Sequence, residues 1–589
     1  MKKLSIILLL VTTTLFSQNT SPFPDWAKGV VWYQIFPERF RNGDTNNDPE
    51  AAKTFSGSHH KVNEDWQITP WGSDWYATKG WENDYGHFNT VLSLRRYGGD
   101  LAGVIEKLPY IKELGITGIY FNPLFEANSL HKYDGSSFHH IDVNFGPNPK
   151  RDRELIATED PTKPETWVIT SADSLFFQLL HKAKAMGIRV IIDGVFNHTG
   201  TDFFAFKDII THGEKSRFKN WFMINSFDDP KTSKNEFAYK GWWDISDLPQ
   251  LNRDEKTLHP EVREYVFNAT RKWLDPNNDG NPEDGIDGWR LDVARDVPLG
   301  FWKEWSAVVK SLNPQALIIG ELWELSPDFV SESGPFDALM NYTFAIAVSD
   351  YFIDKTTKIS KREFINRLRE IDTVYPKRNL DLLQNLMTSH DTERLSSLIK
   401  NPDRNYDRDA DQRNSNYSPA KPTEQEYKIQ KLILAFQTAY RGAPMVYYGD
   451  EVGMWGADDP HCRKPMIWSD IKYDNEVIND DTPFKTGFGD YTVSVNTDLL
   501  NYYKQLLVLR SKYPALREGE INFVETGSEN VVAFTRESNG TTLLCVFNSA
   551  GEQYSLNSLI HSEMNCVVSG ERITPQSVLP GYQALILKK

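Results

Sequence analysis

The sequence predicts an α/β fold, a (β/α)8 barrel, on two observations. Eight short apolar runs read as buried strands, and helical patterns separate most of them. Several of these runs end in carboxylate or imidazole side chains, and the active site of such a barrel lies at the carboxyl ends of its strands. The candidate strands are residues 30–36, 116–121, 189–192, 286–291, 317–320, 337–340, 385–388 and 445–448.

Three of the intervening helices have clear ends. Residues 101–114, 174–186 and 427–440 repeat apolar side chains at helical spacing, and a glycine follows each segment. Glycine readily adopts the left-handed conformation that ends a helix. The alternation of strand and helix therefore supports the barrel.

Length and charge limit the function classes. A chain of 589 residues is long enough for two to four domains and a large core. The net charge of -16 argues against a nucleic acid or an anionic membrane as partner. Aromatic residues make up 13% of the chain. Most belong in the core, but exposed rings offer flat apolar faces to sugars.

The N-terminus has the pattern of an export signal. Met1-Lys2-Lys3 precedes an apolar run over residues 4–16, which predicts a signal peptide over residues 1–18. We expect a secreted or periplasmic protein with no membrane span after cleavage, because the run is short and no other approaches spanning length. A retained N-terminal anchor is the alternative.

Three cysteines occur, and none has the spacing of a zinc site. Cys545 and Cys566 could pair in an oxidising compartment. Simple burial, which is common for cysteine, is the favoured interpretation for all three, including Cys462.

One octapeptide suggests chemistry at a strand end. In Asp287-Gly-Trp-Arg-Leu-Asp-Val-Ala294, the side chains of Arg290 and Asp292 point to the same face of a strand. A fixed arginine favours the ionised aspartate, which suits a nucleophile. A purely structural ion pair is the alternative for this segment alone.

Three further runs strengthen the chemical interpretation. They are Arg189-Val-Ile-Ile-Asp-Gly-Val-Phe-Asn-His198, Ala316-Leu-Ile-Ile-Gly-Glu-Leu-Trp323 and Asn385-Leu-Met-Thr-Ser-His-Asp391. With the octapeptide they resemble, in order, the four signature regions of the α-amylase family, glycoside hydrolase family 13.

The resemblance implies a role for each matching residue. Asp292 is the expected nucleophile and Glu321 the expected general acid/base, whose pKa an apolar surrounding would raise. Asp391 would hold the distorted sugar, with His198 and His390 bonded to it and Tyr133, in His131-Lys-Tyr-Asp134, stacked beneath it. Arg290 completes the expected substrate-binding set.

The resemblance also divides the chain into domains. It implies a catalytic barrel over residues 26–198 and 259–514, with a B domain inserted at residues 199–258. Short alternating segments after residue 514 predict a C-terminal antiparallel β-sandwich over residues 515–589.

Two motifs point to one group within the family. Leu248-Pro-Gln-Leu-Asn252 and Glu321-Leu-Trp323 resemble the neopullulanase, cyclomaltodextrinase and maltogenic amylase group, with Trp323 as an acceptor-side platform. The chain departs from that group at Arg295-Asp296, where Asn-Glu is usual, and it lacks the group's N-terminal domain, since barrel sequence begins by Trp26. Acceptor preference and oligomeric state therefore stay open, with a monomer favoured.

An oxygen-rich loop predicts a calcium site, because Ca²⁺ takes six to eight oxygen ligands. The resemblance implies Asn42, Asp44, Asn47, Asp48, the Gly98 carbonyl and Asp100 as ligands. Asp100 has a rival role as the N-cap of the helix that begins at Leu101. A second candidate, Asp275-Pro-Asn-Asn-Asp-Gly280, has the alternative interpretation of a plain turn.

The function these features imply is retaining, endo-type hydrolysis of α-1,4 bonds in malto-oligosaccharides, starch, pullulan or cyclodextrins. A 4-α-glucanotransferase or α-glucosidase on the same fold is the alternative. A non-catalytic glucan-binding protein is disfavoured, because pure binding needs no acid at Glu321.

Overall fold

The computed structural model describes residues 23–51, 54, 62–229 and 231–589. The predicted signal peptide, residues 1–18, lies outside the described residues. Within the described ranges, no helix combines the length and the apolar character needed to cross a bilayer.

Eight parallel strands form the predicted barrel. They run side by side in the order β10-β9-β8-β3-β2-β1-β12-β11, and a parallel bridge between Met340 and Gln384 joins the two ends of the sheet. All eight candidate strands are present, although the seventh comprises residues 384–385 and not the predicted 385–388. The strands are β1 (Trp32–Ile35), β2 (Gly118–Phe121), β3 (Arg189–Gly194), β8 (Gly288–Leu291), β9 (Leu317–Gly320), β10 (Ala338–Leu339), β11 (Gln384–Asn385) and β12 (Ala443–Tyr447).

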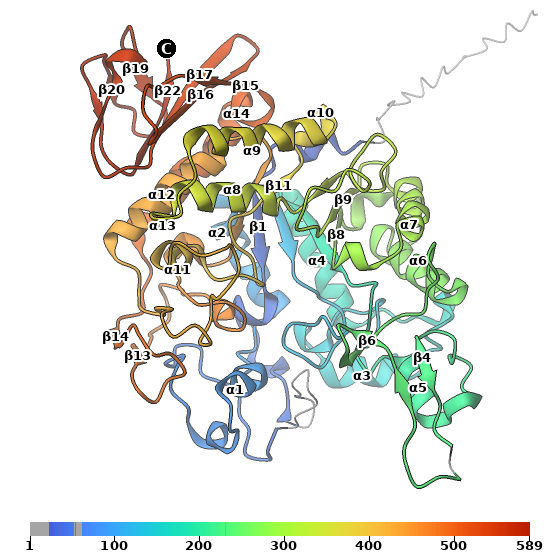
Figure 1. Ribbon diagram of the computed structural model, residues 1–589. Coiled ribbons are helices and arrows are strands. Elements are labelled where there is room, and N and C mark those ends of the chain that lie inside the picture. The colour runs from blue at the N-terminus through green and yellow to red at the C-terminus, as the bar shows by residue number, and fades with distance from the viewer. Residues whose placement is uncertain (1–22, 52–53, 55–61, 230) are drawn as a thin grey trace, which may run out of the picture.

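Helices surround the barrel (Figure 1). The three predicted helices are confirmed. Gly115 and Gly187 follow the ends of the first two and have φ angles of 90° and 72°, whereas Gly442, with a φ of 101°, lies three residues beyond the third helix, which ends at Ala439. The main helices are α2 (Leu101–Glu113), α4 (Ser171–Ala185), α6 (Pro260–Leu274), α7 (Leu299–Leu312), α8 (Tyr342–Phe352), α9 (Lys361–Val374), α12 (Glu424–Ala439) and α13 (Thr497–Lys512).

One connection departs from strict alternation. Residues 321–337, all of them described, link β9 to β10 through turns and contain no helix. Ser326-Pro327-Asp328 and Gly334-Pro335 explain this difference, because proline and glycine favour turns over helix.

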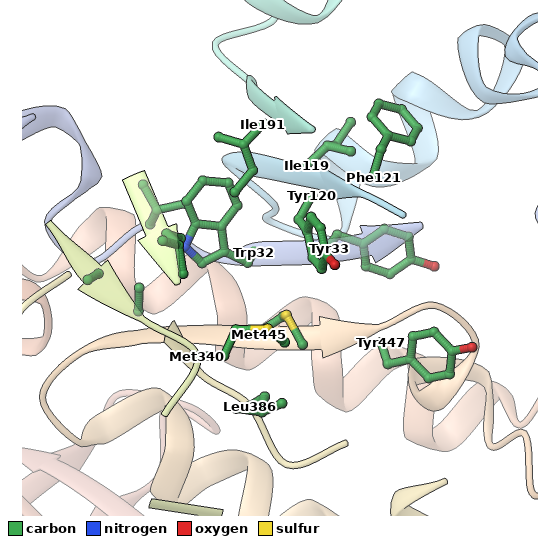
Figure 2. Packing of buried hydrophobic residues seen from close by; sticks show 14 of the residues in the cluster. Trp32, Tyr33, Ile119, Tyr120, Phe121, Ile191, Met340, Leu386, Met445 and Tyr447 are labelled. Atoms are coloured by element: carbon green, nitrogen blue, oxygen red, sulfur yellow. The ribbon is translucent and has the colours of Figure 1, made fainter. Parts of the chain in front are cut away.

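Large apolar side chains fill the barrel (Figure 2). Trp32 of β1, Tyr120 of β2 and Ile191 of β3 are fully buried and lie on the same face of the sheet as Gln34 and Asp193. Such a filled interior is a packed core and not a pore. The polar side chains at the strand ends are therefore supported from below by rigid packing.

The segment between β3 and α6 projects from the barrel (Figure 1). Its described residues contain one α-helix, one short 3-10 helix and two small antiparallel sheets, β4 with β5 and β6 with β7. The elements are α5 (Phe204–His212), β4 (Ile224–Ser226), β5 (Ala238–Tyr239), β6 (Gly241–Trp242) and β7 (Ile245–Pro249). They occupy the region where the resemblance implied the B domain.

The C-terminal strands form the predicted antiparallel structure. A six-stranded sheet has the order β15-β16-β17-β22-β19-β20, and β18 pairs with β21. All three cysteines are unpaired and buried, as favoured from the sequence. The strands are β15 (Glu520–Val524), β16 (Val531–Ser538), β17 (Thr541–Asn548), β18 (Tyr554–Ser555), β19 (Met564–Cys566), β20 (Arg572–Ile573), β21 (Val578–Leu579) and β22 (Gln583–Lys588).

Candidate active site

Arg290 joins three carboxylates at the ends of β3, β8 and β9. Its Nη1 atom lies 2.9 Å from both oxygens of Asp193 and 2.9 Å from Oδ1 of Asp292. Its Nη2 atom lies 3.0 Å from Oε2 of Glu321. Neighbouring strands are about 4.8 Å apart, which brings these side chains within reach of one guanidinium. We call these four residues the carboxylate cluster.

The carboxylate cluster has more acids than bases. Burial raises the pKa of Asp292 well above its ordinary value, and the charges of Glu321 and Asp193 act in the same direction. Arg290 opposes this rise, as the sequence suggested, but it is shared among three carboxylates and does not prevent it. The Asp292 carboxylate therefore lies between one cation that favours its ionised form and two carboxylates that oppose it.

Glu321 accepts two further hydrogen bonds at the end of β9. The Val293 amide donates to Oε2 at 2.8 Å, and Nε1 of Trp323 donates to Oε1 at 3.1 Å. One face of the Trp323 ring stacks on Tyr342, with centroids 3.7 Å apart and planes 9° from parallel. Trp323 thus contacts the candidate acid directly, a role beyond the platform expected from the sequence.

Tyr133 links the carboxylate cluster to His390. Its hydroxyl donates to Oδ2 of Asp193 at 2.9 Å and lies 2.6 Å from Nε2 of His390. The Gln34 amide nitrogen lies 2.9 Å from Nδ1 of His390 and acts as its donor. Because burial lowers the pKa of His390, the neutral ring carries its proton on Nε2, facing Tyr133.

Asp391 lies beside this pair at the end of β11. Its Oδ1 atom is 3.0 Å from Nε2 of His390 and 3.3 Å from Nη2 of Arg463. Burial and the Glu321 carboxylate raise the pKa of Asp391 to about 8, against the charges of Arg463 and Arg290.

His198, which follows β3, is held by the projecting segment. Its ring stacks on Trp242 with centroids 5.1 Å apart, and its Nδ1 atom lies 3.0 Å from the side-chain amide nitrogen of Asn197. Burial lowers the pKa of His198 to about 3, with Arg253 acting in the same direction, so the ring is neutral. Direct contacts thus connect seven of the eight residues predicted for catalysis and sugar binding, and the eighth, His198, follows β3, the strand that carries Asp193.

Sequence reasoning assigned no role to several residues of this network. Asp193 had a signal, because it ends a run of the same type and is paired in register with Arg290. The remaining partners come from distant segments or lack a motif, and nothing in their local sequence marks them. They are Gln34, Tyr120, Tyr342 and Arg463.

The predicted calcium loop has donors that fit the ion. Oδ1 of Asn42 and Oδ1 of Asn47 are buried and have no hydrogen-bond partner among the described residues. Gly98 adopts a φ of 74°, and a Cβ there would lie 2.1 Å from Oδ1 of Asp48. Unpartnered buried oxygens beside a carboxylate match the preference of Ca²⁺.

Asp100 has the rival role instead. Its carboxylate accepts from the amides of Gly43, Asp44 and Gly103 and from Nδ2 of Asn47, and it caps α2. Four donors occupy its lone pairs, which disfavours it as a ligand. The loop at residues 275–280 is a turn, in which Asp275 accepts from the amides of Asp279 and Gly280.

Comparison with known proteins gives one family. The family model described as "Alpha amylase, catalytic domain" matches residues 34–159 and 171–519. Neopullulanase 2 of Thermoactinomyces vulgaris is 34% identical over 96% of this chain and 78% of its own length. A cyclomaltodextrinase of Geobacillus thermopakistaniensis is 32% identical over 94% of this chain and 75% of its own.

Solved structures agree with these matches. The ligand-free cyclic alpha-maltosyl-(1→6)-maltose hydrolase of Arthrobacter globiformis aligns with a TM-score of 0.68 and 26% identity, over 96% of this chain and 99% of that one. The chain therefore belongs to the α-amylase family, glycoside hydrolase family 13, as a glycoside hydrolase similar to neopullulanases and cyclomaltodextrinases.

Proposed function

We propose that the protein cleaves α-1,4-glucosidic bonds with retention of configuration, acting within malto-oligosaccharides, starch, pullulan or cyclodextrins. The observation that carries this proposal is the common attachment of Asp292 and Glu321 to Arg290. Carboxyl groups about 5–5.5 Å apart suit a covalent intermediate, whereas inverting enzymes need room for a water between carboxylate and sugar.

The proposed reaction has two displacements. The Asp292 carboxylate attacks the anomeric carbon while Glu321 gives its proton to the departing glucosidic oxygen, and a glucosyl ester forms on Asp292. Glu321 then removes a proton from water, which attacks the same carbon and releases Asp292. Each displacement inverts the anomeric centre, so the product keeps the α configuration.

The surrounding side chains have positioning roles in this scheme. Arg290 fixes the orientation of both carboxyl groups through its planar guanidinium. Tyr133 and the protonated Nε2 of His390 offer donors and an aromatic face to the sugar at the cleavage point. Asp391 would bind that sugar's hydroxyls.

The relatives support the proposed substrate class. Their names as neopullulanase and cyclomaltodextrinase support pullulan and cyclodextrins beside linear chains. We also propose export to the periplasm or medium, from the basic and apolar N-terminal pattern. The proposed partner is thus an α-glucan outside the cytoplasm.

We further propose Ca²⁺ at the N-terminal loop, held by Asn42, Asp44, Asn47, Asp48 and the Gly98 carbonyl. The ion would neutralise the carboxylates and order the loop, and no step of bond cleavage passes through it. Burial raises the pKa of Asp48 to about 6, a cost that a bound cation would offset.

Proton NMR of early products tests the mechanism. Maltoheptaose cleaved by the wild type should release the α anomer first, before mutarotation, while Glu321→Gln should bind the sugar without cleaving it. First release of the β anomer would rule out Asp292 as nucleophile. A product profile on pullulan, starch and cyclodextrin then defines the substrate range, with panose from pullulan as the neopullulanase-like outcome.

A further inference from the structure

A strained turn carries an exposed tryptophan in the projecting segment. β6 and β7 form a hairpin whose two turn residues, Trp243 and Asp244, have φ angles of 50° and 60°. Two positive φ angles define the turn type that favours Asn-Gly or Gly-Gly. A bulky aromatic residue at positive φ is uncommon and costs conformational energy. Local folding preferences therefore do not explain Trp243.

Core packing does not explain Trp243 either. The residue is 78% exposed, the highest exposure among the large hydrophobic residues in the described part of the chain. Its ring stacks on Trp242 with centroids 4.7 Å apart and planes 22° from parallel. One face is thus supported, while most of the side chain remains in contact with solvent.

The stack continues inward to the active site. Trp242 lies nearly parallel to His198, at an angle of 11°, and its Nε1 atom donates to Asp296 at 2.7 Å. His198 follows β3, the strand that carries Asp193 of the carboxylate cluster. A row of rings, here called the aromatic row (His198, Trp242 and Trp243), therefore runs from the reaction site to the surface.

We propose that Trp243 is an outer binding platform for a glucose residue of a long α-glucan chain whose cleaved bond lies at the carboxylate cluster. The inference rests on the proposed function and extends it to chain-length preference. The C–H face of a glucose ring is apolar and packs on aromatic faces. Trp242 fixes the orientation of this platform, which lowers the conformational entropy lost on binding.

Chain-length kinetics test the platform. We expect Trp243→Ala to lower kcat/KM for maltoheptaose about tenfold, equivalent to ~1.4 kcal/mol, mainly through KM. Cleavage of maltotriose, which has fewer glucose residues beyond the cleaved bond, should be affected less. Trp243→Phe keeps a ring and should restore most of the long-chain preference.

Stability separates binding from a structural role. Trp243→Asn places a residue that tolerates positive φ in the turn, so its melting temperature should match or exceed that of the wild type while long-chain kcat/KM falls. A merely structural tryptophan predicts the opposite, a lower melting temperature with unchanged chain-length preference. Ile210→Ala, at another exposed hydrophobic residue of the projecting segment, is the matched control and should change neither quantity.

The outcomes distinguish the two proposals. If the wild type cleaves both sugars and Trp243→Ala retains the full long-chain preference, the platform is overturned and the proposed function stands. If Trp243→Ala changes only the oligomeric state by light scattering, the exposed ring belongs to an interface between copies and the platform is again overturned. If the wild type neither cleaves nor binds these sugars, both proposals fail.

Discussion

Asp193 and Arg290 are register partners on neighbouring strands, and both oxygens of Asp193 lie 2.9 Å from Nη1 of Arg290. The same carboxylate accepts from the hydroxyls of Tyr120 and Tyr133. Asp193 therefore positions the guanidinium that holds Asp292 and Glu321, although it need not contact the sugar itself.

Replacement of Asp193 should change both the rate and its pH dependence. We expect Asp193→Asn to lower kcat about a hundredfold, because small misplacements of catalytic groups cost that much. The charge of Asp193 raises the pKa of Asp292, so its removal should move the acidic limb of kcat/KM to lower pH. The measurement is a full pH–rate profile.

Asp287→Asn is the matched control for this prediction. Asp287 is buried just before β8 and bonds Arg189 and the Val190 amide, at the opposite end of the strand from Asp292. Its loss should lower the melting temperature without moving the acidic limb. Identical pH profiles for Asp193→Asn and the wild type would show that the charge of Asp193 does not affect the pKa of Asp292.

Asp391 should cost stability at high pH. The folded protein raises its pKa from 3.8 to about 8, so the folded state binds the proton more tightly than the unfolded chain. Stability is therefore lost as pH rises from about 4 to about 8. Asp391→Asn is neutral at every pH, and its melting temperature should exceed that of the wild type by an amount that grows between pH 5 and pH 8. A difference that stays constant with pH would contradict this origin.

Two variants of Trp323 should separate its two contacts. Trp323→Phe keeps a ring on Tyr342 but loses the N–H bond to Glu321, and we expect kcat to fall about tenfold or more, since a hydrogen bond to a charged group is worth about 1.5–3 kcal/mol. Trp323→Ala also loses the aromatic face and should lower the ratio of transglycosylation to hydrolysis. Chromatography of products from maltotriose measures that ratio. An unchanged ratio in Trp323→Ala would leave support of Glu321 as its only role.

The sequence predicted the barrel well because strand period, length and end chemistry are local properties. The runs that become β3, β8 and β9 each combine apolar residues with a terminal acid. The same local pattern therefore predicts both the strand and the carboxylate at its end. Strict alternation of strand and helix fails after β9, because turn-forming residues prevail in the fully described residues 321–337.

Properties that depend on the number of neighbours were not predictable from one strand. The pairing of Arg290 with Asp292 was correct, but the octapeptide contains no sign that Asp193 and Glu321 share the same guanidinium. The raised pKa of Asp292 follows from burial and from those partners. Similarly, the contact between Arg463 and Asp391 joins residues 72 positions apart in the sequence, and no local pattern indicates it.

Calcium should stabilise the fold through the N-terminal loop alone. A ligand that binds only the native state adds about 2.7 kcal/mol at a hundred times its Kd, so Ca²⁺ should raise the melting temperature of chelator-treated protein. Asn42→Ala removes a buried oxygen that has no partner among the described residues and should abolish this rise, whereas Asp279→Ala, in the turn at residues 275–280, should leave it unchanged. Gly98→Ala should also abolish the rise, because its Cβ would lie 2.1 Å from Oδ1 of Asp48.

A calcium response that survives Asn42→Ala and disappears in Asp279→Ala would transfer the site to the second loop. No response in the wild type, with metal absent by elemental analysis, would leave Asn42 and Asn47 as buried amides that hold no ion.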